Sequence, residues 1–494
     1  MSKRKNLLVS LLAVSSIGFA AETKPNIVFI YADDMGYGDV QCLNPEHGKI
    51  ATPNMDQLAA EGMVFTDAHT SSSVCTPSRY GLMTGRYNWR SERQSGVLNG
   101  FGAPLIPTHR MTVASLLKAQ EYNTAMIGKW HLGMNFTKNG KAQHQVDWKG
   151  PVSGGPYDLG FDYYYGISAS LDMPPYIYIE NDHFVGECTT IKAFKRKGPA
   201  QADFEAVNVL PDLAEKAVAY IHQQKDSQPF FTYIALPSPH TPIVPSPEWQ
   251  GKSPLGQYGD YVMQTDSVIG EIIEAVDAAG LAENTLIIIS SDNGCSKAAG
   301  IPALEAKGHY PSAQFRGSKA DLWDGGHRVP FILRWPAGIK AGTQSDQTIC
   351  LTDLMATCAD LVGVKLPDTA GEDSVSFLPA LSGKPIVSTR SGIIHHSISG
   401  HFAYRLGKWK LCLAKGSGGW TAPKEADASA DAPEAQLYDL ENDPGETTNL
   451  YASHPEVAER LLKQLEADVK RGRSTQGPVS ENDVKQIKLW KSGK

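Results

Sequence analysis

The chain has 494 residues, of which 41% are hydrophobic and 20% charged, and its formal net charge is −7. These values are ordinary for a globular protein with a large core, and the length allows more than one domain. The negative charge argues against nucleic acid as a partner. Seven cysteines are too few for a disulfide scaffold, and their odd number leaves at least one thiol unpaired or modified.

The first 21 residues have the pattern of a secretory signal peptide. Basic residues 3–5 precede an apolar run at residues 7–19, which is followed by Ala20 and Ala21. The run is short for a membrane span, and no later stretch approaches spanning length. We therefore expect a signal peptide at residues 1–21 and a secreted or periplasmic mature chain without a membrane span.

Apolar runs rich in β-branched and aromatic residues alternate with helical patterns between residues 24 and 363. The predicted strands are residues 26–31, 124–127, 230–236 and 286–289, and the predicted helices are residues 55–61, 113–119, 213–222 and 262–279. This alternation predicts an α/β fold with a large mixed, mostly parallel central sheet flanked by helices.

The pattern changes after a stretch rich in proline and glycine at residues 366–383. Short antiparallel strands are predicted at residues 392–395, 402–405, 409–413 and 437–440, followed by a helix at residues 455–470. Residues 424–435, rich in Ala, Asp and Glu, are predicted to be a solvated loop. We expect residues 22–365 to form the N-terminal catalytic domain and residues 366–494 a smaller α+β subdomain.

The segment Cys75-Thr76-Pro77-Ser78-Arg79 combines a cysteine, a proline and an arginine at the start of a predicted helix. With Pro77 in the first turn, Cys75 lies at the helix N-terminus, where free N–H groups and the helix dipole favour an anion. Arg79, four residues on, reaches the same face. The alternative is that Cys75 is a buried thiol or half of a disulfide.

Each of the four predicted strands ends in polar residues. Asp33 and Asp34 follow the first strand, and Asp292 and Asn293 follow the last. Ligands of open α/β sheets lie outside the carboxyl ends of the strands, and an all-oxygen set suits Ca²⁺ or Mg²⁺ rather than zinc. Each pair taken alone is better explained by a turn or a helix cap, and it is the two pairs together, each after a buried strand, that favour a metal site.

The other two strand ends carry basic side chains. Lys129 and His131 are two residues apart, which in an extended segment places both on one face. His240 lies between prolines that restrict its backbone. A Gly-rich loop at residues 315–330 presents Lys319 to the same pocket. The alternatives are a surface lysine and structural histidines.

From residue 26 to about residue 336 these motifs, in this order, resemble the sulfatases that use formylglycine. The paired aspartates, C-x-P-x-R, G-K-W-H, the proline-flanked histidine, S-D-N-G and G-x-K-x-x-x-x-x-G-G are all present. Residues 401–405 and 416–420 are similar to segments of sulfatases related to arylsulfatase A and N-acetylgalactosamine-6-sulfatase. The resemblance implies the alkaline-phosphatase-like fold and a sulfuric ester hydrolase.

The resemblance also implies a cofactor and roles for individual residues. A formylglycine-generating enzyme would convert Cys75 to formylglycine (3-oxoalanine), and the modified residue would bind Ca²⁺, with Mg²⁺ less favoured, together with Asp33, Asp34, Asp292 and Asn293. Arg79 and Lys129 would hold the formylglycine and the sulfate. His240, with Lys319, would protonate the leaving alcohol, and His131 would remove the proton that lets sulfate depart.

The expected substrate is a sulfated carbohydrate, with galactose or N-acetylgalactosamine sulfate of a host or algal glycan favoured by the resemblance. Lys129, His240 and Lys319 are expected to contact it, together with His183, His327 and His401. Two further sets are candidates for glycan contact: tyrosines 163, 164, 165, 176 and 178, and the basic loop with Lys192, Lys195, Arg196 and Lys197. Such tyrosines are more often core residues, and such a loop is more often only solvated.

Two other functions stay open on the sequence alone. A phosphonate or phosphate monoester hydrolase, or an arylsulfatase, of the same superfamily would use the same nucleophile and metal. An inactive protein that binds sulfated glycans would leave Cys75 unmodified. The complete set of catalytic residues argues against the inactive protein, because a binding protein has no need of them.

Overall fold

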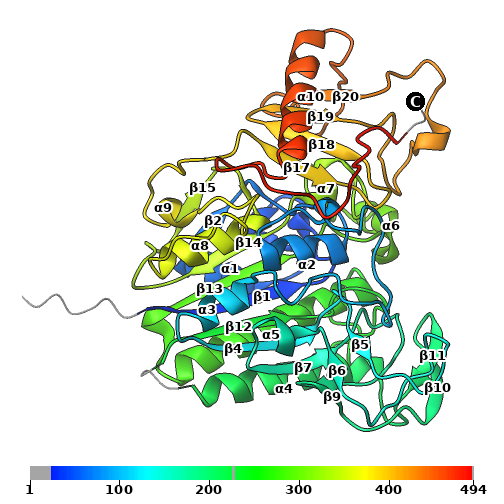
Figure 1. Ribbon diagram of the computed structural model, residues 1–494, viewed down its shortest axis with the longest axis vertical. Coiled ribbons are helices and arrows are strands. Elements are labelled where there is room, and N and C mark those ends of the chain that lie inside the picture. Colours follow the sequence, from blue (N-terminus) through cyan, green and yellow to red (C-terminus); the bar gives the residue numbers. More distant parts are fainter. Residues whose placement is uncertain (1–23, 225–227, 492–494) are drawn as a thin grey trace, which may run out of the picture.

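The computed structural model describes residues 24–224 and 228–491, so the predicted signal peptide lies outside the described residues (Figure 1). A ten-stranded mixed sheet forms the centre of this part of the chain. In sheet order its strands are β15 (Thr343–Ser345), β2 (Met63–Phe65), β14 (Phe331–Arg334), β13 (Thr285–Ser291), β1 (Asn26–Ala32), β12 (Phe230–Ala235), β4 (Asn123–Lys129), β7 (Tyr163–Ile167), β8 (Ile179–Glu180) and β9 (His183–Phe184).

The four strands predicted from their apolar runs lie side by side at the centre of the sheet, in the order β13, β1, β12, β4, and all are parallel. Ile27 of β1 pairs with Phe231 on one side and Leu286 on the other. The prediction of a mostly parallel sheet is confirmed. Because parallel neighbours end at the same edge, the polar residues that follow these strands meet there.

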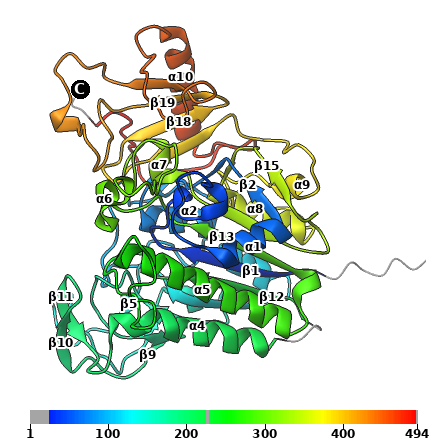
Figure 2. The same ribbon diagram turned by 180° about the vertical axis from the view of Figure 1, so that it is seen from behind.

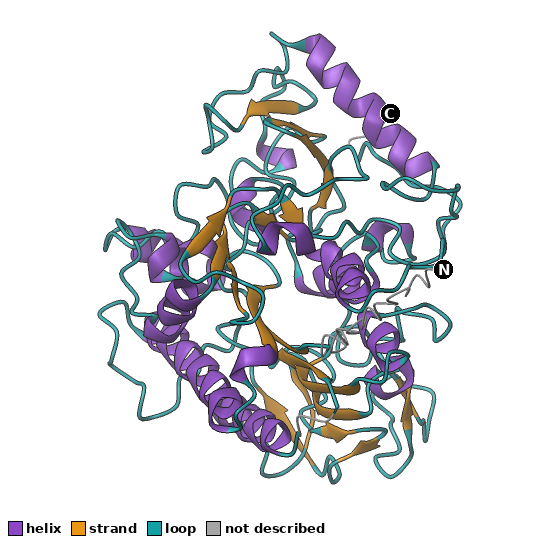
Figure 3. Ribbon diagram, turned by 90° about the vertical axis from the view of Figure 1, so that its left-hand side faces the viewer, coloured by secondary structure: helices purple, strands orange, loops and turns teal. Residues whose placement is uncertain are grey.

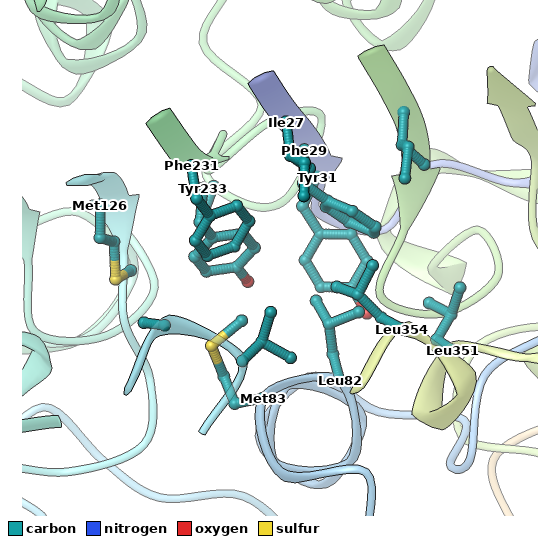
Figure 4. Packing of buried hydrophobic residues seen from close by; sticks show 14 of the residues in the cluster. Ile27, Phe29, Tyr31, Leu82, Met83, Met126, Phe231, Tyr233, Leu351 and Leu354 are labelled. Carbon is teal, nitrogen blue, oxygen red and sulfur yellow. The ribbon is translucent and has the colours of Figure 1, made fainter. Parts of the chain in front are cut away.

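Helices cover both faces of the sheet (Figure 3). One face is covered by α2 (Cys75–Thr84), α3 (Val113–Lys118) and α8 (Leu354–Leu361), and the other by α1 (Pro53–Glu61), α4 (Ala206–His222) and α5 (Gln257–Ala278). On the first face, Phe29 and Tyr31 of β1 point toward Leu82 of α2 (Figure 4). This packing holds α2, the helix that begins at Cys75, against the sheet.

The C-terminal part carries the predicted second sheet. It is antiparallel and consists of β17 (Ile393–His396), β18 (Phe402–Leu406), β19 (Trp409–Cys412) and β20 (Gln436–Asp439) in that order, with α10 (Pro455–Lys470) packed on it. Residues 424–435 are mostly exposed, with one short turn at Glu425–Asp427, as predicted. Tyr87 and Trp89 belong to the core of this sheet, so the N-terminal part contributes to it. The domain boundary after residue 365 stays a prediction.

The remaining elements are short. They are β3 (Ala68–His69), β5 (Asn135–Phe136), β6 (Val152–Ser153), β10 (Thr190–Ala193), β11 (Lys197–Ala200), β16 (Ile349–Cys350), α6 (Ile301–Glu305), α7 (Asp324–His327) and α9 (Leu378–Leu381). The β10–β11 hairpin lies at the opposite end of the molecule from α10 (Figure 2).

Two ion pairs, of which Arg90–Asp373 is fully buried, connect the segment after α2 to residues far along the chain. The Arg90 guanidinium donates to Asp373 at 2.8 Å through both Nε and Nη2. Arg86 Nη1 donates to Asp483 Oδ2 at 3.1 Å. Residues from the C-terminal part of the chain therefore anchor the segment that follows α2.

All seven cysteines lie in the described part of the chain, and each is a free thiol. In residues 24–224 and 228–491 there is no helix that is both long and apolar enough to cross a membrane.

Candidate active site

Ten of the predicted residues form one buried polar cluster at the carboxyl edge of the central strands, and none is more than 7% exposed. The members of this buried polar cluster are Asp33, Asp34, Cys75, Arg79, Lys129, His131, His240, Asp292, Asn293 and Lys319. Lys129 is the last residue of β4, and the others follow β1, β4, β12 or β13, or lie in α2 and in the loop before α7. Residues almost 290 positions apart are thus brought together by the parallel order of the strands.

The acidic side chains are paired with cations from other elements. Lys129 Nζ donates to Asp33 Oδ2 at 2.6 Å, and Lys319 Nζ donates to Asp34 Oδ1 at 2.5 Å. Arg79 Nη2 lies 2.8 Å from Asp292 Oδ2. Burial favours the protonated acid, yet Lys129 holds the pKa of Asp33 well below its ordinary value. Burial and the charge of Asp33 raise the pKa of Asp292 to about 7.

Three oxygens of the cluster are buried and have no hydrogen-bond donor among the described residues. They are Asp33 Oδ1, Asp34 Oδ2 and Asn293 Oδ1. An unsatisfied buried carboxylate oxygen costs stability unless a proton or a cation completes it. Carboxylate and amide oxygens are the ligands that hard divalent cations accept, so the residues present fit such an ion.

Cys75 is the first residue of α2, as predicted, and its thiol makes no hydrogen bond within the described residues. Burial raises the pKa of the Cys75 thiol, although Lys129 and Lys319 act in the opposite direction. An unmodified Cys75 is therefore protonated near neutral pH and is a weak nucleophile.

His131 has a backbone that differs from the prediction. The strand β4 ends at Lys129, and His131 has a φ of +58°, so the expected extended segment with both side chains on one face is wrong. His131 Nε2 lies 2.8 Å from the carbonyl oxygen of Leu98, which can only accept, so Nε2 carries the proton. His131 Nδ1 is buried and unpartnered. Burial lowers the pKa of His131, so its free nitrogen is a neutral acceptor.

His240 and Lys319 lie on either side of Asp34. His240 Nδ1 donates to the carbonyl of Thr241 at 2.7 Å, and its Nε2 lies 3.7 Å from Asp34 Oδ2. Burial lowers the pKa of His240, so the ring is neutral near pH 7. Burial also favours neutral Lys319, but Asp34 outweighs it and raises the pKa of Lys319, so this residue keeps its proton.

A second cluster contains three buried histidines, His69, His327 and His395. The rings of His327 and His395 stack with centroids 3.7 Å apart, and His69 Nδ1 lies 3.1 Å from His327 Nδ1. Lys410 Nζ lies 3.1 Å from His327 Nε2, and Arg405 Nη1 lies 2.7 Å from His69 Nε2. The positive charges of Lys410 and Arg405 would repel a metal cation bound by these histidines. We therefore interpret the histidine cluster as structural.

The three histidines proposed to read the sugar lie apart from one another. His183 is exposed beside Asp182, and His327 belongs to the histidine cluster. His401 is buried, with Nδ1 3.1 Å from the carbonyl of Leu413. Its turn does border the site, because the N–H of Ile398 donates to the carbonyl of Ala320, next to Lys319. Their roles in substrate binding stay predictions.

The tyrosines considered as a sugar platform belong to the core. The ring of Tyr165 stacks on Tyr178, and that of Tyr163 on Tyr220, against the sheet face covered by α4. Sequence reasoning missed Thr76 and Leu98. Thr76 Oγ1 donates to the carbonyl of His131 at 3.0 Å and accepts the N–H of Leu98 at 3.1 Å. Both partners of Thr76 in these contacts are backbone groups, so the residue pattern carried no signal for them.

Comparisons with known proteins agree with this arrangement. A family model described as Sulfatase matches residues 25–364. N-acetylgalactosamine-6-O-sulfatase of Bacteroides thetaiotaomicron is 34% identical, over 90% of this chain and 93% of that protein. Arylsulfatase A of Homo sapiens is 32% identical, over 92% of this chain and 90% of that protein. A structure solved in work on the metabolism of multiple glycosaminoglycans by Bacteroides thetaiotaomicron has a TM-score of 0.80 and 32% identity, over 90% of this chain and 99% of that one.

Proposed function

This chain belongs to the sulfatase family and is a sulfuric ester hydrolase, and from that premise we propose that it removes sulfate from galactose or N-acetylgalactosamine in a sulfated glycan. The observation that carries the substrate class is the 34% identity, over nearly the whole chain, to a protein named N-acetylgalactosamine-6-O-sulfatase. The predicted signal peptide supports a secreted or periplasmic enzyme that meets such glycans outside the cytoplasm.

The proposal includes a modified Cys75 and a bound cation. Formylglycine, made from Cys75 by a maturation enzyme, would supply a hydroxyl nucleophile in its hydrated form, and Ca²⁺, with Mg²⁺ less favoured, would supply charge for its activation and for the sulfate. Asp33, Asp34, Asp292 and Asn293 would hold the ion. The unpartnered oxygens of the cluster support the cation, and the protonated state of the Cys75 thiol supports the need for modification.

The remaining residues of the cluster bind the sulfate and move protons. Arg79, Lys129 and Lys319 present fixed positive charge to the anionic group in a buried site, where such charge stabilises the transition state most strongly. Lys319 Nζ, which keeps its proton, gives a proton to the leaving alcohol, and His240 would assist it only after its neutral Nε2 has itself received a proton. His131 Nδ1, free and neutral, takes a proton from the nucleophilic residue so that sulfate departs.

Sulfate release from a panel of position-defined monosulfated sugars tests the proposal. The protein is produced together with a formylglycine-generating enzyme, and the mass of the Cys75 peptide is measured. Release from galactose or N-acetylgalactosamine sulfate is the expected result. Release only from aryl sulfates, or faster turnover of phosphonate esters with the aldehyde present, contradicts the proposed substrate.

Removing the cation is expected to lower stability and activity together. An ion bound to the native state alone stabilises it by about 4 kcal/mol when its concentration is a thousand times the dissociation constant. Prolonged treatment with a chelator should therefore lower the melting temperature and abolish sulfate release, and added Ca²⁺ should restore both. A chelated protein shown by elemental analysis to be free of metal, yet with unchanged melting temperature, would argue against the ion.

A further inference from the structure

A cavity of about 590 Å³ lies beside the buried polar cluster. One continuous segment, residues 92–105, supplies most of its wall, and Gln143, Met173 and Arg196 complete it. Its volume is in the range of pockets that bind small ligands. Its polar lining includes Arg93, Asn99 and Gln143, and none of the residues given a catalytic role above lines it.

Leu98 connects the cavity to the site of reaction. This residue lines the cavity, and its carbonyl is the acceptor 2.8 Å from His131 Nε2. The Leu98 N–H donates to Thr76 Oγ1, and Thr76 follows Cys75 in α2. A sugar in the cavity would therefore lie one residue away from the histidine that faces the reacting group.

Two arginines give the cavity its positive charge. The guanidinium of Arg93 makes no hydrogen bond or ion pair with any described residue, although the side chain is only partly exposed. Arg196 is 52% exposed at its side chain and pairs with Asp172 Oδ2 at 2.9 Å. Asp172 partly offsets this charge, and so does Glu92 at the exposed rim. Arg93 is thus a guanidinium without a partner inside a concave surface.

Arg196 is the one residue of the predicted basic loop that lines this cavity. Lys192 of the same hairpin is already occupied, because its Nζ donates to Glu205 Oε1 at 2.7 Å. Lys197 is exposed and makes no contact with the cavity. The hairpin therefore contributes one basic residue to this site, because its turn brings the Arg196 side chain to the cavity that Arg93 also lines.

We propose that this cavity binds the sugar next to the sulfated one, and that Arg93 and Arg196 recognise an anionic group on it. The guanidinium fork matches the planar oxygens of a carboxylate and those of a sulfate. The inference rests on the proposed function and deepens it: the substrate is a polyanionic glycan with a uronate or a second sulfate on the neighbouring sugar, rather than an isolated monosulfated sugar.

Matched disaccharides test this proposal. The first is 6-O-sulfated N-acetylgalactosamine linked to a hexuronate, the second is its neutral uronamide, and the third carries a second sulfate in place of the carboxylate. The wild-type enzyme is expected to have a lower KM for an acidic disaccharide than for the uronamide. Arg93→Gln should raise that KM by roughly tenfold or more, as expected for a lost charge-assisted hydrogen bond, and leave kinetics on the uronamide and the monosaccharide unchanged.

Lys197→Ala is the matched control, because it removes one charge from the same hairpin without altering the cavity. Arg196→Gln should act in the same direction as Arg93→Gln. KM values for both acidic disaccharides equal to that for the uronamide, or an equal loss in Lys197→Ala, would overturn the proposal. The first and third disaccharides distinguish a carboxylate from a sulfate as the anion.

Failure of this inference is distinguishable from failure of the proposed function. Sulfate release from the monosaccharide without any preference for acidic disaccharides overturns the cavity's role alone. An enzyme that releases no sulfate from any sugar overturns the proposed function. In that event calorimetry with the Cys75→Ala variant still decides the inference, because affinity for the acidic disaccharide should exceed that for the uronamide and fall in Cys75→Ala/Arg93→Gln.

Discussion

The Cys75→Ala variant is expected to lose sulfate release by about four to six orders of magnitude, the range seen when an enzyme loses its nucleophile. The reason is chemical rather than structural. The Cys75 thiol makes no hydrogen bond in the described structure, so its removal leaves no polar group without a partner. The melting temperature should therefore change little. Initial rates on the best sugar of the panel and a thermal melt of the same preparation provide the measurement.

Cys42→Ala is the control for this experiment. Cys42 is a free, exposed thiol in the turn before α1, outside the buried polar cluster, and its loss should affect neither rate nor melting temperature. Near-normal sulfate release by Cys75→Ala would refute the mechanism. A Cys75→Ala protein that melts many degrees lower would instead show that Cys75 contributes to packing, and the rate loss would then say nothing about the nucleophile.

Stability should fall steeply as the pH drops from 7 toward 5, because of the histidine cluster. Burial lowers the pKa of His69 to about 4 and holds those of His327 and His395 well below 6.5. In the unfolded chain each histidine takes up a proton below its ordinary pKa of about 6.5, so unfolding binds protons and becomes easier in acid. Three such groups together lower the free energy of unfolding by up to about 6 kcal/mol at pH 5 relative to pH 8.

His395→Phe tests the assignment to this cluster. Phenylalanine keeps an aromatic ring in the stack on His327 and removes one of the three titrating groups. Denaturant unfolding at several pH values between 5 and 8 should then show a slope against pH reduced by up to one bound proton, which is about 1.4 kcal/mol per pH unit. His183→Phe, at an exposed histidine, is the matched control. An unchanged slope in His395→Phe would show that other groups govern acid unfolding.

The central fold could be predicted because buried parallel strands are continuous apolar runs. Residues 26–31 and 286–289 show no alternation of polar and apolar positions, which is typical of a strand buried on both faces. In the structure these two strands are direct neighbours. The end of α4 was predicted, but its start was placed seven residues late, after Pro211. Proline removes a backbone N–H and disfavours a helix. In α4 the packing of the buried face, which includes Val209 and Leu210, offsets that loss.

Side-chain partnerships between distant residues could not be predicted. The residues of the buried polar cluster were found because each follows a strand and the strands share an edge. His69, His327 and His395 follow no such rule: they come from β3, α7 and β17, and neither hydrophobic period nor local motif relates them. The left-handed backbone of His131 could not be predicted for the same reason. The contact of its ring with Leu98 depends on a loop that has no periodic pattern.

The ion pair between Arg86 and Asp483 joins residues that are 397 positions apart. A ribosome adds 5 to 20 residues per second, so roughly 20 to 80 seconds pass between the synthesis of Arg86 and that of Asp483. Throughout that interval the segment after α2 lacks this contact. The Cys75 thiol is 2% exposed once the chain has folded. If Cys75 is oxidised as proposed, the maturation enzyme would have to act before the chain folds around α2 and buries the thiol.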